Sequence, residues 1–188
     1  PPRRRGRTSA PGTAGGDATD LRAVTPYRRA ADPAALALAP GERILGGGTW
    51  LFSEPQPDTT GLVDLTGMGW APFEPLPDGG LRIAATATIA ELLALPTNPT
   101  WTAQPLFRQA AECLLASHKV WESATIGGNV AQSFAAGAMI SMAATLDGVA
   151  EVWRADGTDA RVRVADVPAG NGVNSLDRGD VIRAIELP

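Results

Sequence analysis

The chain has 188 residues, 44% of them hydrophobic and 19% charged, which supports one packed domain, or one domain of two lobes, and excludes a wholly disordered protein. No run approaches the roughly 20 apolar residues of a membrane span, and a single cysteine excludes both an intrachain disulfide and a Cys-ligated iron–sulfur cluster held by this chain alone. Residues 30–188 carry nine basic and 18 acidic groups, an acidic balance that argues against a nucleic-acid-binding surface.

The first 23 residues are predicted to form a disordered tail. They are rich in Pro, Gly, Ser and Thr and contain a basic run, Arg3 to Arg5 and Arg7. Paired arginines suggest an export signal, but no apolar segment of the required length follows them. A partner-binding arm is the alternative interpretation of this segment.

A small N-terminal lobe is expected over about residues 24–80. The stretch 32–39 predicts a helix, with Asp32 as N-cap and Pro33 in the first turn, because both residue types favour helix starts. Short apolar runs at 43–45 and 61–66 predict two strands, each bounded by turn-forming residues. Asp64, near the end of the second strand, is interpreted as a turn residue, with a role as a ribose ligand as the alternative.

A second lobe is expected over about residues 81–188 and begins with a strand and three helices. Thr88 and Glu91 form a capping-box pattern that opens a helix. The apolar stripe of the helix at 105–117 includes Cys113, which is therefore predicted to pack in the core. The predicted elements are a strand at 81–88 and helices at 89–95, 105–117 and 135–148.

Three alternating strands close the chain, at 149–155, 160–166 and 180–187, and Asp156-Gly157 predicts a hairpin between the first two. Mixed elements followed by a strand-rich end predict an α+β fold of two lobes: a small βαβ-like lobe and a larger lobe of antiparallel strands and helices. A single doubly wound sheet is not expected.

The first glycine segment, "RILGGGTWLF", does not satisfy the Rossmann fingerprint. Gly46 and Gly48 fit G-x-G-x-x-G, but Leu51 stands at the third glycine position. Pro55 and Pro57 also leave too little room for the helix that a βαβ crossover needs. What remains is a strand that delivers bare amides into a helical turn headed by Thr49, a possible nest for anionic oxygens, with a simple tight turn as the alternative.

The second glycine segment is "TIGGN". Gly127 and Gly128 allow a close approach, Thr125 offers a hydroxyl group, and Asn129 offers both a donor and an acceptor. Two such segments, neither of them at a hairpin, are better explained by one shared diphosphate than by two unrelated turns.

Four stretches carry a resemblance to a known family: "ILGGGTWL", "GLVDLTGM", "LRIAATATIAELL" and, most specifically, "ATIGGNVAQSFAAGAMISMAATLDGVAEV". In this order they resemble the FAD-binding domain of the molybdenum hydroxylases, over residues 24–188. The resemblance implies a two-lobed flavin fold with FAD between the lobes. It also implies that the family's smaller C-terminal domain is absent. The cofactor-binding residues it implies are Leu45, Gly46, Gly47, Gly48, Thr49, Trp50, Leu51, Thr125, Ile126, Gly127, Gly128 and Asn129.

The chain departs from the family pattern next to both glycine segments. Trp50 stands where the family has Asp or Ser, Trp121 where it has Arg, and Ala138 where it commonly has an Asp that would bind sugar or ribityl hydroxyls. The two indoles would stack on a ring of the cofactor or fill a pocket that no longer binds flavin.

The resemblance implies an FAD-binding electron-transfer subunit of a molybdenum hydroxylase. Its partners would be a molybdopterin-binding large subunit and a [2Fe–2S] small subunit, and no catalytic side chain is implied in this chain because the redox chemistry belongs to the cofactor. A free thiol fits the reducing cytoplasm, where we expect the protein. Two alternatives remain: a flavin-free structural subunit of such a complex and a free-standing flavin oxidoreductase.

Overall fold

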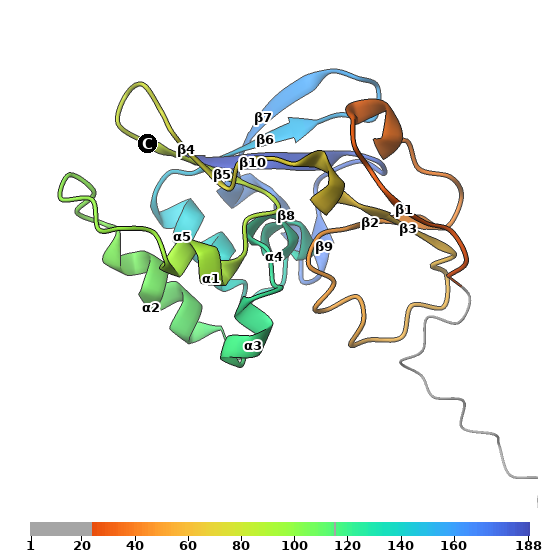
Figure 1. Ribbon diagram of the computed structural model, residues 1–188, viewed down its shortest axis with the longest axis horizontal. Helices are drawn as coiled ribbons and strands as arrows, with labels where there is room; N and C mark the ends of the chain where they lie inside the picture. Colours follow the sequence, from red (N-terminus) through yellow and green to blue (C-terminus); the bar gives the residue numbers. More distant parts are fainter. Residues whose placement is uncertain (1–23, 115) are drawn as a thin grey trace, which may run out of the picture.

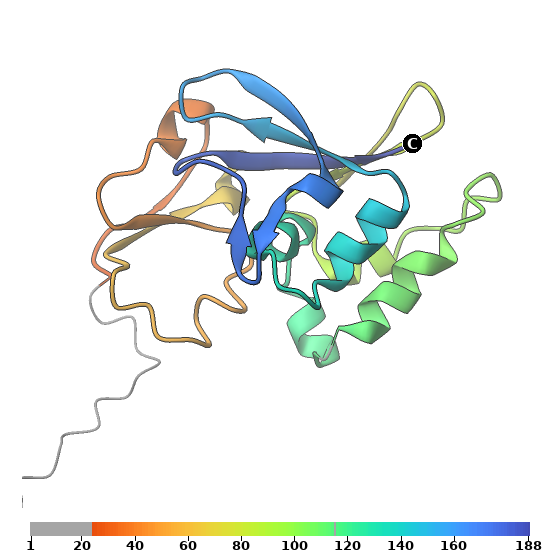
Figure 2. The same cartoon turned by 180° about the vertical axis from the view of Figure 1, so that it is seen from behind.

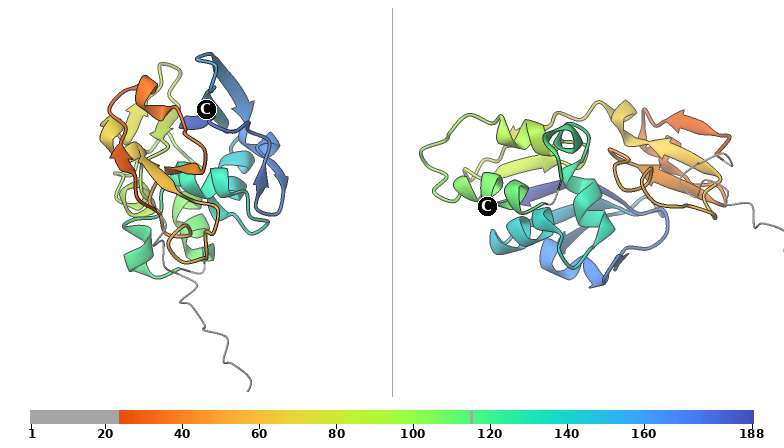
Figure 3. Two further views of the ribbon diagram at one scale, coloured as in Figure 1. Left: turned by 90° about the vertical axis from the view of Figure 1, so that its right-hand side faces the viewer. Right: turned by 90° about the horizontal axis from the view of Figure 1, so that it is seen from below.

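The described residues form two main β-sheets, a small parallel sheet near the N-terminus and a larger antiparallel sheet that carries the helices, together with a separate two-stranded hairpin (Figure 1). A computed structural model describes residues 24–114 and 116–188, so the predicted tail lies outside the described residues. The small sheet lies to one side of the larger body when the molecule is seen from below (Figure 3). The expected α+β, two-lobed arrangement is confirmed, and the sheets follow no Rossmann pattern.

The small sheet has the order β1-β3-β2, with all strands parallel. Its strands are β1 (Tyr27–Arg29), β2 (Glu42–Leu45) and β3 (Gly61–Asp64), of which the sequence predicted the last two. The helical pieces of this lobe are the 3-10 helices η1 (Pro33–Leu36) and η2 (Leu65–Met68). Because the strands are parallel, their carboxyl ends lie at one edge of the sheet, and the first glycine segment leaves from that edge.

The predicted helix at 32–39 is wrong in its second half. Asp32 caps its start as expected, accepting a hydrogen bond from the Ala35 amide at 3.0 Å. The helix stops after Leu36 because the guanidinium group of Arg28 binds the Ala35 and Ala37 carbonyl oxygens. A contact from another strand, which no local pattern encodes, therefore decides where this helix ends.

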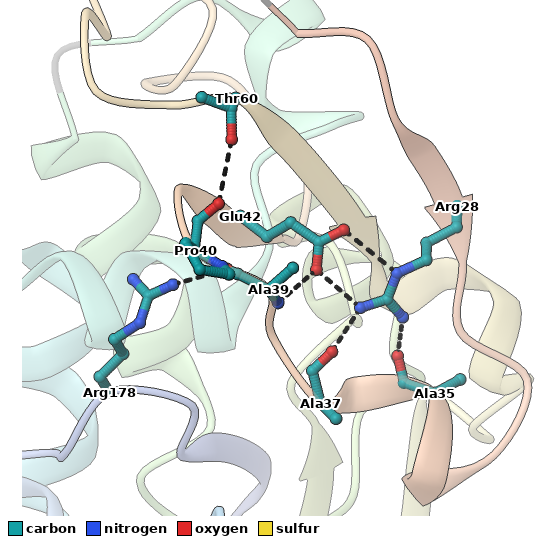
Figure 4. A network of polar contacts seen from close by, with 8 residues as sticks. All are labelled: Arg28, Ala35, Ala37, Ala39, Pro40, Glu42, Thr60 and Arg178. Carbon is teal, nitrogen blue, oxygen red and sulfur yellow. Dashed lines mark hydrogen bonds and ion pairs between the residues drawn. The ribbon is translucent and has the colours of Figure 1, made fainter.

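Glu42 anchors the start of β2 from a buried position (Figure 4). Its carboxylate accepts hydrogen bonds from the Arg28 guanidinium and from the Ala39 amide, both at 2.9 Å. Arg178, from the other lobe, donates to the Ala39 carbonyl oxygen at 2.8 Å. The hydrogen bond from Arg28, and next the one from Ala39, lower the pKa of Glu42 below its ordinary value. The strand that carries the first glycine segment is thus fixed at its other end.

The larger sheet has the order β4-β5-β10-β6-β7 and is antiparallel throughout. The predicted hairpin at Asp156-Gly157 joins β6 and β7, and Gly157 adopts a φ of 86° that glycine tolerates best. The strands of this sheet are β4 (Phe73–Pro75), β5 (Leu81–Ala84), β6 (Val149–Trp153), β7 (Asp159–Arg163) and β10 (Val181–Leu187), and a separate hairpin is formed by β8 (Pro168–Gly170) and β9 (Val173–Asn174).

The described residues form five short α-helices. They lie on one side of the larger sheet (Figures 1 and 2). Their apolar sides form one core with the inward residues of the strands, among them Ile83 and Ile185 of the sheet and Ile126 and Met139 of the helices. The capping box of Thr88 and Glu91 is present in full. The helices are α1 (Ile89–Leu93), α2 (Pro105–Cys113), α3 (His118–Trp121), α4 (Ile126–Gln132) and α5 (Ala138–Thr145), with a 3-10 turn η3 at Val164–Asp166.

Cys113 is exposed at the end of α2, so its predicted place in the core is wrong. The buried side of the helix is formed by Phe107, Ala110 and Ala111. Phe107 and Ala111 lie four residues apart on this face, whereas Cys113 lies two residues beyond Ala111, and residues two apart do not share a helix face. The helix packs on α5, and Cys113 is exposed to solvent.

β4 pairs with β5, although it lies within the stretch assigned to the first lobe. The predicted lobe boundary near residue 80 stays a prediction, and we propose that the first lobe ends between η2 and β4. Across residues 24–114 and 116–188, none of the helices is both long enough and apolar enough to span a bilayer.

Candidate functional site

The two glycine segments, far apart in the sequence, meet at the junction of the two lobes. A Cβ atom added to Gly46 would stand 2.8 Å from the Thr125 hydroxyl oxygen, and one added to Gly47 would stand 1.5 Å from the Ser123 carbonyl oxygen. Real Cβ atoms do not approach backbone oxygens so closely, so only glycine lets the segments touch at Gly47. The structure therefore places the first predicted site directly against the start of the second.

The first segment, which we call the glycine loop, runs from Gly46 to Leu51 after β2. The Phe52 amide donates to the Gly48 carbonyl oxygen at 2.9 Å, and the Glu54 amide donates to the Trp50 carbonyl oxygen at 3.2 Å. These bonds form the short helical turn that the sequence predicted. Gly48 has a φ of 72°, so a left-handed residue turns the chain from the strand into this turn.

The backbone N–H groups of the glycine loop have no acceptor among residues 24–114 and 116–188. All six of these residues, Gly46 to Leu51, are half-buried. Buried or half-buried backbone donors are normally paired with protein, water or ligand. A run of neighbouring free donors concentrates positive potential and attracts anionic oxygens. The glycine loop is therefore the strongest candidate for an anion-binding site in the described part of the chain.

In the second segment, the backbone N–H groups already have acceptors within the protein. Thr125 caps α4, and Gly127 and Gly128 lie in the first turn of that helix. Each amide has an acceptor: Ile126 donates to the Ala87 carbonyl at 2.8 Å, Gly127 to the Ala85 carbonyl at 3.0 Å, Gly128 to the Thr125 hydroxyl at 3.1 Å and Asn129 to the Thr125 carbonyl at 3.0 Å. These four groups cannot serve as free donors without losing a bond that they already make.

The bare backbone of the second segment serves close packing. A Cβ atom on Gly127 would stand 2.4 Å from the Cβ atom of Ala85, so α4 lies directly on the end of β5. Ile126 is fully buried, and the Asn129 side chain accepts a hydrogen bond from the Met139 amide at 3.1 Å, which ties α4 to α5. Gly128 is the exposed residue of the segment. The predicted contact of the second segment, from Thr125 to Asn129, with a ligand stays a prediction.

The two tryptophans next to these segments occupy different environments. Trp50 is half-buried in the glycine loop, and its ring packs edge-on against Phe134, with 5.7 Å between ring centroids. Trp121 lies in the core at 7% exposure, beside His118, and its Nε1 has no partner among the described residues. Trp50 is therefore the indole that faces the junction of the lobes at the glycine loop.

Two other residues singled out in the sequence have structural environments. Asp64 is buried at the end of β3, where it accepts hydrogen bonds from the Thr66 amide at 2.8 Å and from the Tyr27 hydroxyl. The bond to Asp64 raises the pKa of Tyr27. Ala138 is buried at the start of α5 and offers no side-chain hydrogen bond. The turn interpretation of Asp64 fits this environment.

A separate hollow of about 350 Å³ lies between the β4–β5 turn and the start of α2. It is lined by apolar groups such as Leu81 and Phe107. Two polar side chains at its rim already have partners: Trp101 Nε1 donates to the Gly79 carbonyl at 2.8 Å, and Gln104 Nε2 donates to the Pro96 carbonyl at 2.9 Å. Its lining contains no residue of either glycine segment.

The sequence pattern located the glycine loop but did not identify its neighbours. Ser123 and Phe134 complete the junction of the lobes, and Ala85 supports Gly127 within the second lobe. No local signal distinguishes a serine or alanine that touches a distant glycine. Among the described residues, no three His, Cys, Asp or Glu side chains come together in a way that could hold a metal ion.

The family model for the FAD-binding domain in molybdopterin dehydrogenase matches residues 24–188. Solved structures agree. Reconstituted CO dehydrogenase from Oligotropha carboxidovorans is 25% identical with a TM-score of 0.75, and quinoline 2-oxidoreductase from Pseudomonas putida 86 is 25% identical with a TM-score of 0.73. Each match covers 87% of this chain and 58% of the other.

A carbon monoxide dehydrogenase from Hydrogenophaga pseudoflava, in a form lacking the Mo-pyranopterin moiety, shares the fold at 20% identity and a TM-score of 0.73, over 88% of this chain and 59% of its own. The chain thus spans a little under three fifths of the length of these relatives. No curated protein sequence gives a significant match.

Proposed function

This chain belongs to the family of FAD-binding domains in molybdopterin dehydrogenases, and from that membership we propose that it works as the flavin-carrying electron-transfer component of a molybdenum hydroxylase. FAD is the cofactor of the family. The observation that carries the proposal is the set of unpaired amides in the glycine loop, Gly46 to Leu51, at the junction of the two lobes. An FAD diphosphate supplies the anionic oxygens that such amides lack.

The residues present fit the cofactor at its diphosphate. Gly46 and Gly47 let the loop pack closely against Thr125 and Ser123. This contact holds the amides of the loop in place. Glu42 and Arg28 hold the other end of β2, which limits movement of the loop. The role of the second segment in this proposal is to support the glycine loop through Thr125 and α4, with the exposed Gly128 as its point of contact with the cofactor.

FAD supplies the redox chemistry when it is bound, and the chain's own residues bind, orient and shield it. We assign no catalytic side chain to this chain. The partners proposed are a molybdopterin-binding large subunit, where the substrate would react, and a [2Fe–2S] small subunit that passes electrons to the flavin. One cysteine is too few to hold such a cluster in this chain. Oxidoreductases of this kind are the solved relatives.

Titration of the purified protein with FAD tests the proposal. We expect one FAD per chain, retained on gel filtration, and co-purification with the two partner subunits when all three are produced together. A folded chain that binds no FAD would contradict the proposal and support the alternative of a structural subunit, to which the buried Ala138 points. FAD binding without any association with the partners would support a free-standing flavin oxidoreductase.

A further inference from the structure

Two aromatic side chains from different lobes meet beside the glycine loop. Trp50 belongs to the loop itself, and Phe134 follows α4 in the other lobe. Their rings pack edge to face, with centroids 5.7 Å apart and planes at 64°. The contact brings an indole and a phenyl ring to the same junction that holds the unpaired amides.

This pair is open to solvent on one side. Phe134 is 36% exposed, and Phe52, whose ring edge approaches Gly48, is 50% exposed. A single exposed aromatic residue is ordinary on a protein surface. Here two of the four large hydrophobic residues that are exposed within 24–114 and 116–188 lie against one loop, which points to a surface that is covered in the working protein.

The Phe134 ring is supported by the β8–β9 hairpin. Gly172, in the β8–β9 hairpin, lies under Phe134, since a Cβ atom there would stand 3.4 Å from the Phe134 ring. The Gly172 amide donates to the Ser133 carbonyl at 2.9 Å, and the Asn171 side chain accepts from the Ala135 amide at 3.0 Å. Hydrogen bonds on both sides of Phe134 therefore fix the backbone that presents its ring.

Free amides and exposed rings in one place suit a ligand that is both anionic and aromatic. Phosphate oxygens bind backbone donors, and a planar heteroaromatic ring stacks on an aromatic side chain with an affinity gain of about tenfold or more. A partner protein that covers the rings would leave the donors unexplained. A free phosphate would leave the rings unexplained.

We propose that Trp50 and Phe134 form a ring-stacking subsite for a heteroaromatic ring of the same dinucleotide whose diphosphate lies on the glycine loop. The inference rests on the proposed FAD binding and deepens it. The ring is adenine or isoalloxazine. Both are planar heteroaromatic rings of FAD, and binding experiments with ADP and FMN distinguish them.

The test compares Trp50→Leu and Phe134→Leu with the wild-type chain in titrations with FAD, ADP and FMN. Leucine keeps an apolar side chain but removes the stacking face. We expect each substitution to weaken FAD about tenfold. An equal loss for ADP with FMN unchanged assigns the ring to adenine, and the reverse result assigns it to isoalloxazine. Trp101→Leu, which removes a half-buried indole away from the glycine loop, is the matched control and should bind FAD as the wild type does.

Trp50→Phe and Phe134→Tyr keep an aromatic face and should restore FAD affinity to within about threefold of wild type, which keeps the test decisive if a leucine variant unfolds. If the wild type binds FAD and the leucine variants bind it equally well, the stacking subsite is refuted while the proposed function stands. If the folded wild type does not bind FAD, the proposed function fails and this inference fails with it.

Discussion

The glycine loop and the start of α4 look alike in sequence and differ in what their bare backbone does. In the glycine loop the amides have no acceptor among the described residues, whereas at the start of α4 each amide from Ile126 to Asn129 already has one. Glycine in the first segment lets the two lobes touch at Ser123 and Thr125. Glycine in the second lets a helix lie on a strand at Ala85.

The difference teaches that adjacent glycines alone do not identify a ligand site. A close backbone approach requires the absence of a Cβ atom, whether or not the amide nearby is free. The two kinds of segment differ in whether their backbone N–H groups have acceptors, and the acceptors of Ile126 and Gly127 come from residues distant in the sequence.

The largest effect is expected for Gly47→Ala. Its Cβ atom would stand 1.5 Å from the Ser123 carbonyl oxygen, and neither backbone can yield without separating the lobes. We expect a loss of more than about 3 kcal/mol in the free energy of unfolding and loss of FAD binding. Urea unfolding and FAD titration measure both. Gly170→Ala is the control, since its Cβ atom would make an ordinary contact at 3.7 Å. Equal behaviour of the two variants would show that the lobes do not meet at Gly47.

Gly127→Ala should separate packing from binding. The added Cβ atom would crowd Ala85 at 2.4 Å and cost about 2 kcal/mol of unfolding free energy, as overpacked core sites do. Because the amide of Gly127 is already bonded, the folded variant should bind FAD within about threefold of wild type. A variant of normal stability that fails to bind FAD would reverse the comparison and place the diphosphate at α4.

Glu42→Gln tests the strand that presents the glycine loop. Arg28 lowers the pKa of Glu42 in the folded chain, so the carboxylate contributes stability above its unfolded pKa, about 4.3, and loses that contribution as the pH falls through the lower folded value. We expect a loss of about 1.5 kcal/mol at pH 7, which shrinks toward zero in acid. Unfolding midpoints across the pH range measure it. A loss that is independent of pH would show that the charge has no part in it.

The smallest effect is expected for Thr125→Val, which keeps the shape of the side chain and removes the hydroxyl group that caps Gly128. Loss of an N-cap costs about 1 kcal/mol. Thermal unfolding should detect it, and Thr125→Ser should restore most of the stability. No destabilisation in the valine variant would mean that the start of α4 does not depend on its cap.

Much of the fold could be predicted from local pattern. The capping box of Thr88, the hairpin at Gly157 and the buried helix α5 follow from short-range rules and are confirmed. The errors lie where distant contacts decide. Arg28 ends η1 early, and the packing of α2 on α5 turns Cys113 outward. β1 and β4 escaped prediction because each has only three residues.

The sequence predicted where in the chain the site residues lie, but not how they are arranged in space. The sequence marks both glycine segments, yet it cannot show that Gly47 touches Ser123 or that the amides of α4 are already bonded. The same holds for the two tryptophans, since Trp50 faces the junction and Trp121 is buried, although each was expected to add a ring to one cleft.

Nuclear magnetic resonance of the protein labelled with ¹⁵N-glycine tests most directly whether the glycine loop holds the diphosphate. On addition of FAD, the amide signals of Gly46, Gly47 and Gly48 should shift strongly as their N–H groups gain acceptors. The signal of Gly127, whose N–H is already bonded to Ala85, should move little. Strong shifts at Gly127 and Gly128 with an unchanged glycine loop, in a sample that binds FAD, would contradict the assignment.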